Sequence, residues 1–364
     1  MRAARGLRDP GLCASPQGHD WVDDCAYAPP RCLAAWCTQV SCGAHLRCAC
    51  VVPPPSLAGV AGDVLAVVGR VCSSPLAPSS LVRFSATCRY VRTVLRPVVE
   101  ELQALHAAVR VLCTKIGMRP ADLGKVTELN AAFKRLDYAD VAVLVTLANS
   151  GSLRLLTVLS LADNNISDPG MVALSEALGN GSLRSLTQLF LNHNQIGDAG
   201  MIEFSRSIAS GSLRSLIQLF LNDNQIGDAG MIEFSRSIAS GSLRSLTQLF
   251  LNDNQIGDAG MIEFSRSIAS GSLRALTTLF LNDNQIGDAG MIEFSRSITN
   301  GSLRALTRLD LDDNQIGDAG MTDFSRAIAS GSLPACNVID VRGNPGNAAS
   351  LKAACAERGF SCRS

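Results

Sequence analysis

Residues Leu246–Ala275 read LTQLFLNDNQIGDAGMIEFSRSIASGSLRA, and the chain returns to this sequence every 30 residues. A weaker copy covers residues 126–155, and a partial unit begins at residue 336. A fixed period without insertions is typical of a protein built from stacked structural repeats, in which each unit buries its apolar face against its neighbours. The regular copies begin at Leu156, Leu186, Leu216, Leu246, Leu276 and Leu306.

Each unit predicts one short strand and one helix. Leu189 and Leu191 alternate with Gln188 and Phe190, a period of two that is typical of a strand with one buried face. Met201, Phe204 and Ile208 then recur at helical spacing and form the inward stripe of a helix that runs to about residue 210, where a glycine follows. Because a helix connects each strand to the next, the strands are expected to pair in parallel.

An asparagine follows every predicted strand. A buried amide at this point can bond to backbone groups of adjacent turns, and repetition every unit would give a continuous ladder. The predicted structural ladder consists of Asn164, Asn194, Asn224, Asn254, Asn284, Asn314 and Asn344.

An aspartate recurs at the start of every predicted helix. One carboxylate per turn lacks the neighbouring oxygen ligands that Ca²⁺ requires, so we expect each aspartate to cap its own helix, and no metal site is expected. The residues concerned are Asp198, Asp228, Asp258, Asp288 and Asp318.

The LxxLxL spacing of Leu186, Leu189 and Leu191, followed by Asn194, resembles the leucine-rich repeat of the long, ribonuclease-inhibitor type. The resemblance covers residues 126–364. It implies an α/β fold: a leucine-rich-repeat solenoid, or horseshoe, with parallel strands on the concave face and helices on the convex face. It also implies a non-catalytic protein–protein interaction module that binds its partner on the concave face, with no cofactor.

The strand positions that point away from the core make up the predicted concave wall. Its phenylalanines, aligned on neighbouring strands, would form an apolar stripe with a polar border, which usually marks a binding surface. Alternatively, the rings stack on one another and stabilise the sheet without any ligand. The candidate partner-binding residues are Gln188, Phe190, Asn192, Gln218, Phe220, Asn222, Gln248, Phe250, Asn252, Phe280, Asn282, Arg308, Asp310 and Asp312.

Residues 57–113 carry apolar positions at helical spacing, and the stretch from Gly62 to Arg92 resembles an F-box. The opening Leu-Pro of that family is Val60-Ala61 here, and the usual tryptophan is Val91. The resemblance implies a substrate-recognition subunit of a cullin-type ubiquitin ligase, with residues 57–97 bound to a Skp-type adaptor. The implied adaptor-binding residues are Val64, Leu65, Leu81, Val82, Phe84 and Cys88.

In the alternative interpretation, residues 57–113 are only a helical cap that covers the apolar edge of the first repeat. The chain would then be a standalone scaffold, inhibitor, or cytoskeletal or ciliary binding protein. The predicted domains are therefore a tail of residues 1–56, the helical segment 57–113, and repeats over 114–364. The repeats divide into a degenerate unit 126–155, regular units 156–335 and a capping unit 336–364.

The tail of residues 1–56 is rich in proline and cysteine and is expected to have little order. Its alternative is a zinc site made by Cys42, His45 and Cys48 with Cys37 or Cys50, although a second clean ligand pair is missing.

The composition excludes several classes of function. With 32 basic and 32 acidic side chains the chain has no net charge, so it offers no global attraction to nucleic acid or to an anionic membrane. No phosphate-binding glycine loop occurs, and the apolar run of residues 57–72 falls short of the roughly 20 residues that span a bilayer. Without a secretory signal, the expected location is the cytoplasm, with the nucleus as an alternative.

Overall fold

The computed structural model describes the backbone of residues 89–364 and the side chains of residues 96–364. The tail of residues 1–56 lies outside the described residues, together with its zinc alternative. The six F-box positions, Val64, Leu65, Leu81, Val82, Phe84 and Cys88, lie outside them as well. The chain divides into two compact units, and Glu101–Ser364 makes up most of the second.

One parallel sheet runs through this second unit. Its nine strands follow one another in chain order, and Leu189 and Phe190 pair in register with Leu219 and Phe220. Successive repeats are therefore aligned residue for residue, which confirms the predicted repeat solenoid. The strands are β1 (Glu128–Asn130), β2 (Val158–Ser160), β3 (Gln188–Phe190), β4 (Gln218–Phe220), β5 (Gln248–Phe250), β6 (Thr278–Phe280), β7 (Arg308–Asp310), β8 (Val338–Asp340) and β9 (Ser361–Arg363).

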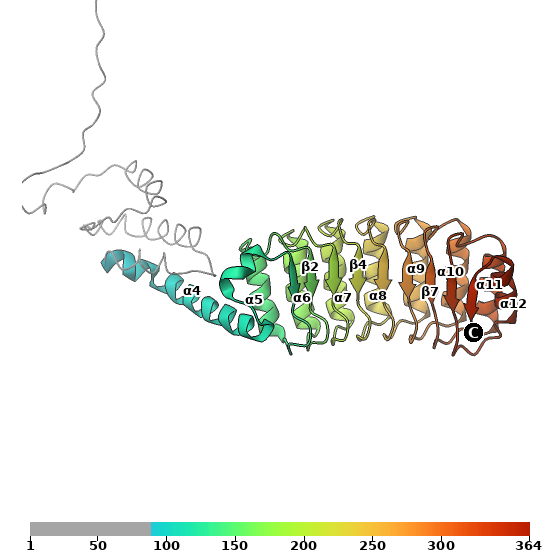
Figure 1. Cartoon of the computed structure of the whole chain (residues 1–364), viewed down its shortest axis with the longest axis horizontal. Coiled ribbons are helices and arrows are strands. Elements are labelled where there is room, and N and C mark those ends of the chain that lie inside the picture. The colour runs from blue at the N-terminus through green and yellow to red at the C-terminus, as the bar shows by residue number, and fades with distance from the viewer. Residues whose placement is uncertain (1–88) are drawn as a thin grey trace, which may run out of the picture. The chain divides into compact units, whose positions relative to one another are not determined.

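Helices alternate with the strands and pack side by side along the array (Figure 1). The first repeat begins after helix α4 and the short 3₁₀ helix η2. None of the helices within residues 89–364 is both long enough and apolar enough to cross a membrane. The helical elements are α4 (Arg89–Ile116), η2 (Pro120–Lys125), α5 (Tyr138–Asn149), α6 (Asp168–Gly179), α7 (Asp198–Ala209), α8 (Asp228–Ala239), α9 (Asp258–Ala269), α10 (Asp288–Thr299), α11 (Asp318–Ala329) and α12 (Ala349–Glu357).

The core lies between the sheet and the helix layer. Leu189 and Leu191 from the strand side and Met201, Phe204 and Ile208 from the helix side are fully buried, as the two periodicities predict. The equivalent residues of the other repeats join them in one continuous apolar cluster. The regular units therefore bury equivalent apolar side chains, and the stability of each unit depends on the neighbours that cover it.

Glycine ends each regular helix. Gly211 follows α7 with a φ of 80°. This left-handed conformation costs glycine little because it has no Cβ, and it allows the chain to leave the helix toward the next strand. The predicted helix end is confirmed at this position.

Both ends of the array are covered. At the first repeat, Val109, Leu112 and Ile116 from the last turns of α4 join the core, and Nζ of Lys115 lies 2.5 Å from Oδ2 of Asp140 in α5. At the other end α12 and β9 complete the sheet, with Leu351 buried. Capping elements of this kind shield the apolar faces that terminal repeats would otherwise expose.

Candidate binding surface on the strands

The asparagines fix the ends of the strands. Nδ2 of Asn194 donates to the carbonyl oxygens of Leu161 and Leu191, both at 3.0 Å, and Oδ1 accepts from the backbone N–H of Ile166 at 3.1 Å. Leu161 and Ile166 belong to the preceding repeat, so each amide joins two units. The same bonds to the preceding unit recur at Asn224, Asn254, Asn284, Asn314 and Asn344.

The aspartates at the helix starts do not cap their own helices, which corrects the sequence-based prediction. Gly197 is the N-cap of α7, and no side chain caps the helix from that position. Instead Oδ1 of Asp198 accepts hydrogen bonds from the backbone N–H groups of Gly227 and Gly230, both at 2.8 Å, at the start of α8. Each aspartate therefore satisfies unpaired donors of the next repeat, because stacking brings that helix terminus within reach of its side chain.

The glycines of the Gly-Asp-Ala-Gly step make this contact possible. A Cβ on Gly230 would lie 2.8 Å from Oδ1 of Asp198 and 2.9 Å from Cβ of Met201. Those separations are shorter than normal non-bonded contacts, so a side chain at position 230 would push the two repeats apart. The motif thus sets the close spacing of neighbouring helices.

The outward positions of the strands share one face, which we call the strand wall. It comprises the candidate residues from Gln188 to Asp312 named above. The wall side chains of Gln188, Phe190 and Asn192 are half-buried, whereas Leu189 between them is fully buried. The predicted inward and outward alternation is therefore present, and strand register places each wall residue beside its equivalent in the next repeat.

Four phenylalanine rings stack along the wall. The ring centroids lie 4.6 Å apart for Phe190 and Phe220, 4.2 Å for Phe220 and Phe250, and 4.8 Å for Phe250 and Phe280. The guanidinium of Arg308 covers the last ring at 4.5 Å from its centroid. The rings are half-buried, so the stripe exposes less apolar area than four isolated rings, and mutual stacking already stabilises it.

Polar residues border the stack and also bond to one another. Nε2 of Gln218 donates to Oε1 of Gln248 at 2.9 Å, across β4 and β5. Nδ2 of Asn222 donates to Oδ2 of Asp223 at 2.6 Å, and Asn252 repeats this bond to Asp253. The border is thus an ordered series of amides and carboxylates.

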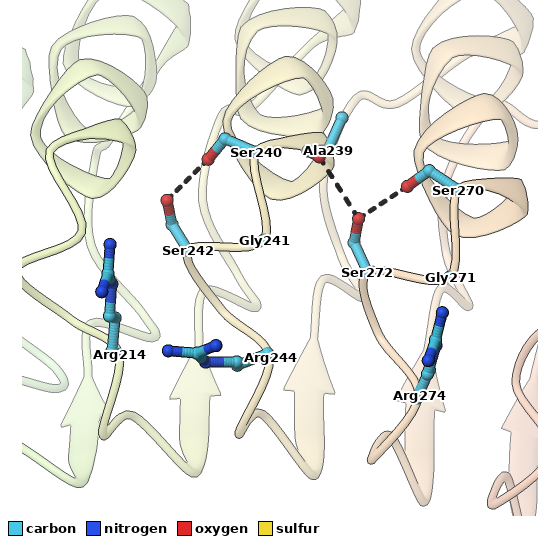
Figure 2. Close-up of a pocket in the computed structure, with 10 residues that line it drawn as sticks. All are labelled: Arg214, Ala239, Ser240, Gly241, Ser242, Arg244, Ser270, Gly271, Ser272 and Arg274. Carbon is cyan, nitrogen blue, oxygen red and sulfur yellow. Dashed lines mark hydrogen bonds between the residues drawn. The ribbon is translucent and has the colours of Figure 1, made fainter.

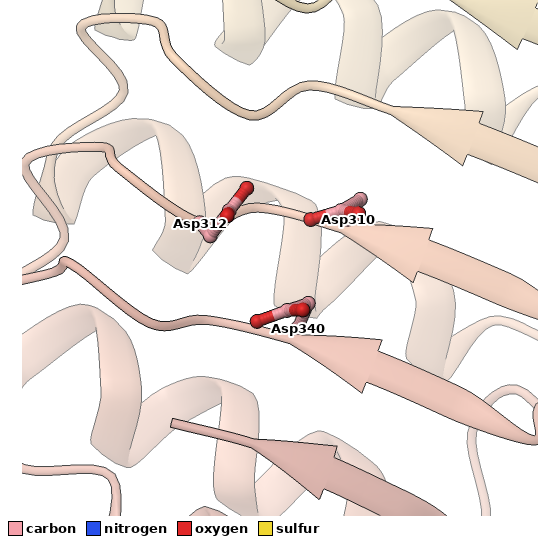
Figure 3. A group of neighbouring side chains, drawn as sticks. All are labelled: Asp310, Asp312 and Asp340. Carbon is pink, nitrogen blue, oxygen red and sulfur yellow. The ribbon is translucent and has the colours of Figure 1, made fainter.

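The wall changes character at β7, where charged residues replace the aromatic series. Asp310 lies beside Asp340 of β8 in strand register, and Asp312 follows two residues later in the loop (Figure 3). One oxygen from each of the three carboxylates lies within 4.8 Å of the other two. Nε and Nη2 of Arg342 donate to the two oxygens of Asp340, both at 2.9 Å.

These contacts shift the pKa values of two carboxyl groups in opposite directions. Burial, together with the neighbouring carboxyl of Asp310, raises the pKa of Asp312 to about 7. Burial also disfavours the charged form of Asp340, but the hydrogen bonds from Arg342 outweigh it and hold the pKa of Asp340 below its usual value. The sequence reveals the acidic residues and their 30-residue offset, but not which of them gains an arginine partner.

A second feature lies at the loop edge that precedes the strands. A surface hollow of about 470 Å³ is lined by Arg214, Arg244 and Arg274 with the Ser-Gly-Ser turns after α8 and α9 (Figure 2). Its lining contains neither a carboxylate nor a histidine or cysteine, so it offers no general acid–base pair. The lining arginine recurs with the 30-residue period, so this surface is repeated along the array.

The repeats of the chain match the model of a known protein family. The family model described as leucine-rich repeat matches residues 152–175, 182–205, 212–235, 242–265, 273–295 and 302–325. The chain therefore contains six leucine-rich repeats, each a strand and helix of the solenoid described above. No curated protein sequence matches the chain.

Solved structures that are similar to the chain include an internalin and a plant receptor. Internalin C2 from Listeria monocytogenes is 26% identical with a TM-score of 0.43, and the match covers 68% of this chain and 88% of that one. A plant peptide hormone receptor, RGFR1 in complex with RGF2, is 22% identical with a TM-score of 0.35, over 55% of this chain and 30% of the receptor.

Proposed function

We propose that the chain is a non-catalytic protein-binding module that holds a protein partner on the strand wall. The observation that supports this most is the wall itself, where strand register aligns the same outward positions over successive repeats. The row of stacked aromatic rings offers apolar area, and its polar border offers hydrogen-bonding groups. A protein interface has the same arrangement, with an apolar centre and a polar rim.

The two ends of the wall differ, and this difference favours an elongated partner. The aromatic stack begins at Phe190 and ends at Arg308, beyond which Asp310, Asp312 and Asp340 lie. A partner that follows the wall would place an apolar strip over the rings and basic groups near the carboxylates.

Site-specific photo-crosslinking tests the proposal. A photoreactive amino acid at Gln218 lies on the wall, and one at Ile232 lies on α8 of the same repeat, half-buried on the helix layer. The expected result is a discrete crosslinked product in native cell extract from position 218 and none from position 232. Equal crosslinking from both positions, or from position 232 alone, would contradict binding at the wall.

A finer proposal assigns the chain to a cullin-type ubiquitin ligase as its substrate receptor. It rests on the sequence of residues 57–97 and on their resemblance to an F-box. The alternatives are a standalone scaffold, an inhibitor, or a cytoskeletal or ciliary binding protein. The assignment of the repeats to the ribonuclease-inhibitor type and the location in the cytoplasm or nucleus are likewise proposals drawn from the sequence.

A binding assay with a purified Skp-type adaptor distinguishes these functions. If residues 57–97 form an F-box, the wild-type chain binds the adaptor and the Leu81→Asp, Val82→Asp double variant does not. The matched control, Ile232→Asp, changes a half-buried side chain in the repeats and is expected to retain adaptor binding. Failure of the wild-type chain to bind would favour the standalone module.

A further inference from the structure

Two carboxylates at the end of the strand wall, those of Asp310 and Asp312, each have one oxygen without a hydrogen-bond partner. The side chain of Asp310 is only 10% exposed. Its Oδ1 is buried without a hydrogen-bond donor, and so is Oδ1 of Asp312. A buried acceptor left without a partner is unfavourable, and more so when it is charged, so each of these oxygens requires a proton or a cation.

The arginines near the cluster do not supply that partner. Arg342 binds both oxygens of Asp340 and is 3.8 Å from Oδ2 of Asp312. Arg308 contacts Oδ2 of Asp310 at 3.5 Å, and Arg363 lies 3.7 Å from Asp340. All these contacts on Asp310 and Asp312 go to Oδ2, so they reduce the total charge but leave the two Oδ1 atoms unpaired.

The cluster arises where this unit departs from the repeat. In the four preceding units, the position equivalent to Asp310 is phenylalanine and the position equivalent to Asp312 is asparagine. Strand register then brings Asp340 beside Asp310. Three carboxylates therefore converge at this turn of the sheet (Figure 3).

We propose that Asp310, Asp312 and Asp340 form a Ca²⁺-binding site. The ligands are all hard carboxylate oxygens, which suit Ca²⁺, Mg²⁺ and Mn²⁺ rather than softer metals. Ca²⁺ accepts irregular coordination by about six to eight oxygens at about 2.3–2.6 Å, whereas Mg²⁺ requires near-ideal octahedral geometry at about 2.0–2.1 Å. The three carboxylates come from two strands and a loop and form an irregular set of ligands, with one oxygen of each within 4.8 Å of the other two. This irregularity favours Ca²⁺, and water would complete the coordination.

This site revises the expectation, drawn from the helix-start aspartates, that the chain binds no metal. Those aspartates stand one per repeat and cap the next helix. The new site uses carboxylates from β7, from the loop that follows β7 and from β8. Those of Asp310 and Asp312 each have an unpaired oxygen. It is independent of the proposed partner, since cation binding is measured on the isolated chain.

Calorimetric titration of the purified 364-residue chain with CaCl₂, after treatment with a chelator, tests the site. We expect saturable binding of one Ca²⁺ and a rise in the unfolding temperature on Ca²⁺ addition. Asp312→Asn restores the residue of the preceding repeats and is expected to fold normally. It should weaken Ca²⁺ binding by at least about tenfold, since even changes to groups behind the ligands usually cost about 10- to 100-fold, and Asp310→Asn should do the same.

Asp283→Asn is the matched control, because it removes one carboxylate from an exposed loop of the neighbouring repeat. It should retain wild-type Ca²⁺ affinity. Mg²⁺ in the same titration should bind more weakly than Ca²⁺.

Absence of saturable Ca²⁺ binding up to ~10 mM, beyond the range of the weaker natural calcium modules, would overturn the site. A proton shared by Asp310 and Asp312 would then account for their burial. Binding that is unchanged in both Asp→Asn variants would overturn it equally, since Ca²⁺ would lie elsewhere.

Discussion

Asp198 caps a helix that belongs to the next repeat: its Oδ1 accepts a hydrogen bond from the backbone N–H of Gly230 at 2.8 Å. The N-terminus of α8 is therefore complete only when the preceding unit is folded against it. Since the bond recurs from Asp168 to Asp288, capping couples neighbouring repeats along the array. This adds a polar contribution to the apolar interface between units.

Removal of one such cap should loosen the following helix. Asp228→Ala deletes the acceptor for the N–H groups of Gly257 and Gly260 and should cost about 0.5–2 kcal/mol of unfolding free energy. Asp228→Asn keeps an oxygen acceptor and should lose less. Hydrogen exchange should show faster exchange at the start of α9; faster exchange confined to α8 would mean that the aspartate acts within its own repeat.

Asn254 provides a second test of coupling between repeats. Its amide bonds to the carbonyl oxygen of Leu221 and to the N–H of Ile226, both in the preceding unit, at 3.0 Å each. Asn254→Ala leaves these buried groups without partners and should cost on the order of 1–3 kcal/mol in urea unfolding. Gln255→Ala, at the exposed neighbouring position, should stay within about 0.5 kcal/mol of wild type. Equal effects would indicate that the ladder contributes little.

The repeat fold was predictable because its signals are local and periodic. The alternation around Leu189 and the helical spacing of Met201 and Phe204 specify which faces are buried, and the 30-residue period specifies the register. The partner of Asp198 was not predictable in this way. Whether a carboxylate reaches its own helix or the next depends on how closely the units stack, and Gly227 and Gly230 determine that distance.

The strand wall was predicted in part. Register alone brings Phe220 beside Phe250 and Asp310 beside Asp340, so the alignment follows from the sequence. The orientation of the rings and the pairing of Arg342 with Asp340 depend on side-chain conformation, which the periodic sequence pattern does not specify. Whether each oxygen of Asp310 meets a hydrogen-bond donor depends on these side-chain conformations, so its unpaired oxygen is evident only from the structure.

The cysteines of the C-terminal cap should differ in their response to pH. Burial raises the pKa of the Cys336 thiol to about 11, so little thiolate forms near neutral pH. A hydrogen bond from Cys355 lowers the pKa of Cys362, which therefore ionises at lower pH. Because the thiolate is the reactive form, Cys362 should be alkylated by iodoacetamide first as the pH rises. Mass spectrometry of the native chain reads both sites; modification of Cys336 before Cys362 would contradict this ranking.

The most direct test of the account is the affinity of a purified crosslinked partner for two double variants. Phe220→Ser with Phe250→Ser alters the strand wall, and Ile232→Ser with Ile262→Ser alters the helix layer of the same two repeats. Loss of buried apolar area should weaken binding to the wall variant by at least about tenfold, or ~1.4 kcal/mol, while the helix variant binds as wild type. Thermal unfolding of both variants monitors their folding. Wild-type affinity in a folded wall variant, or an equal loss in both variants, would contradict binding at the strand wall.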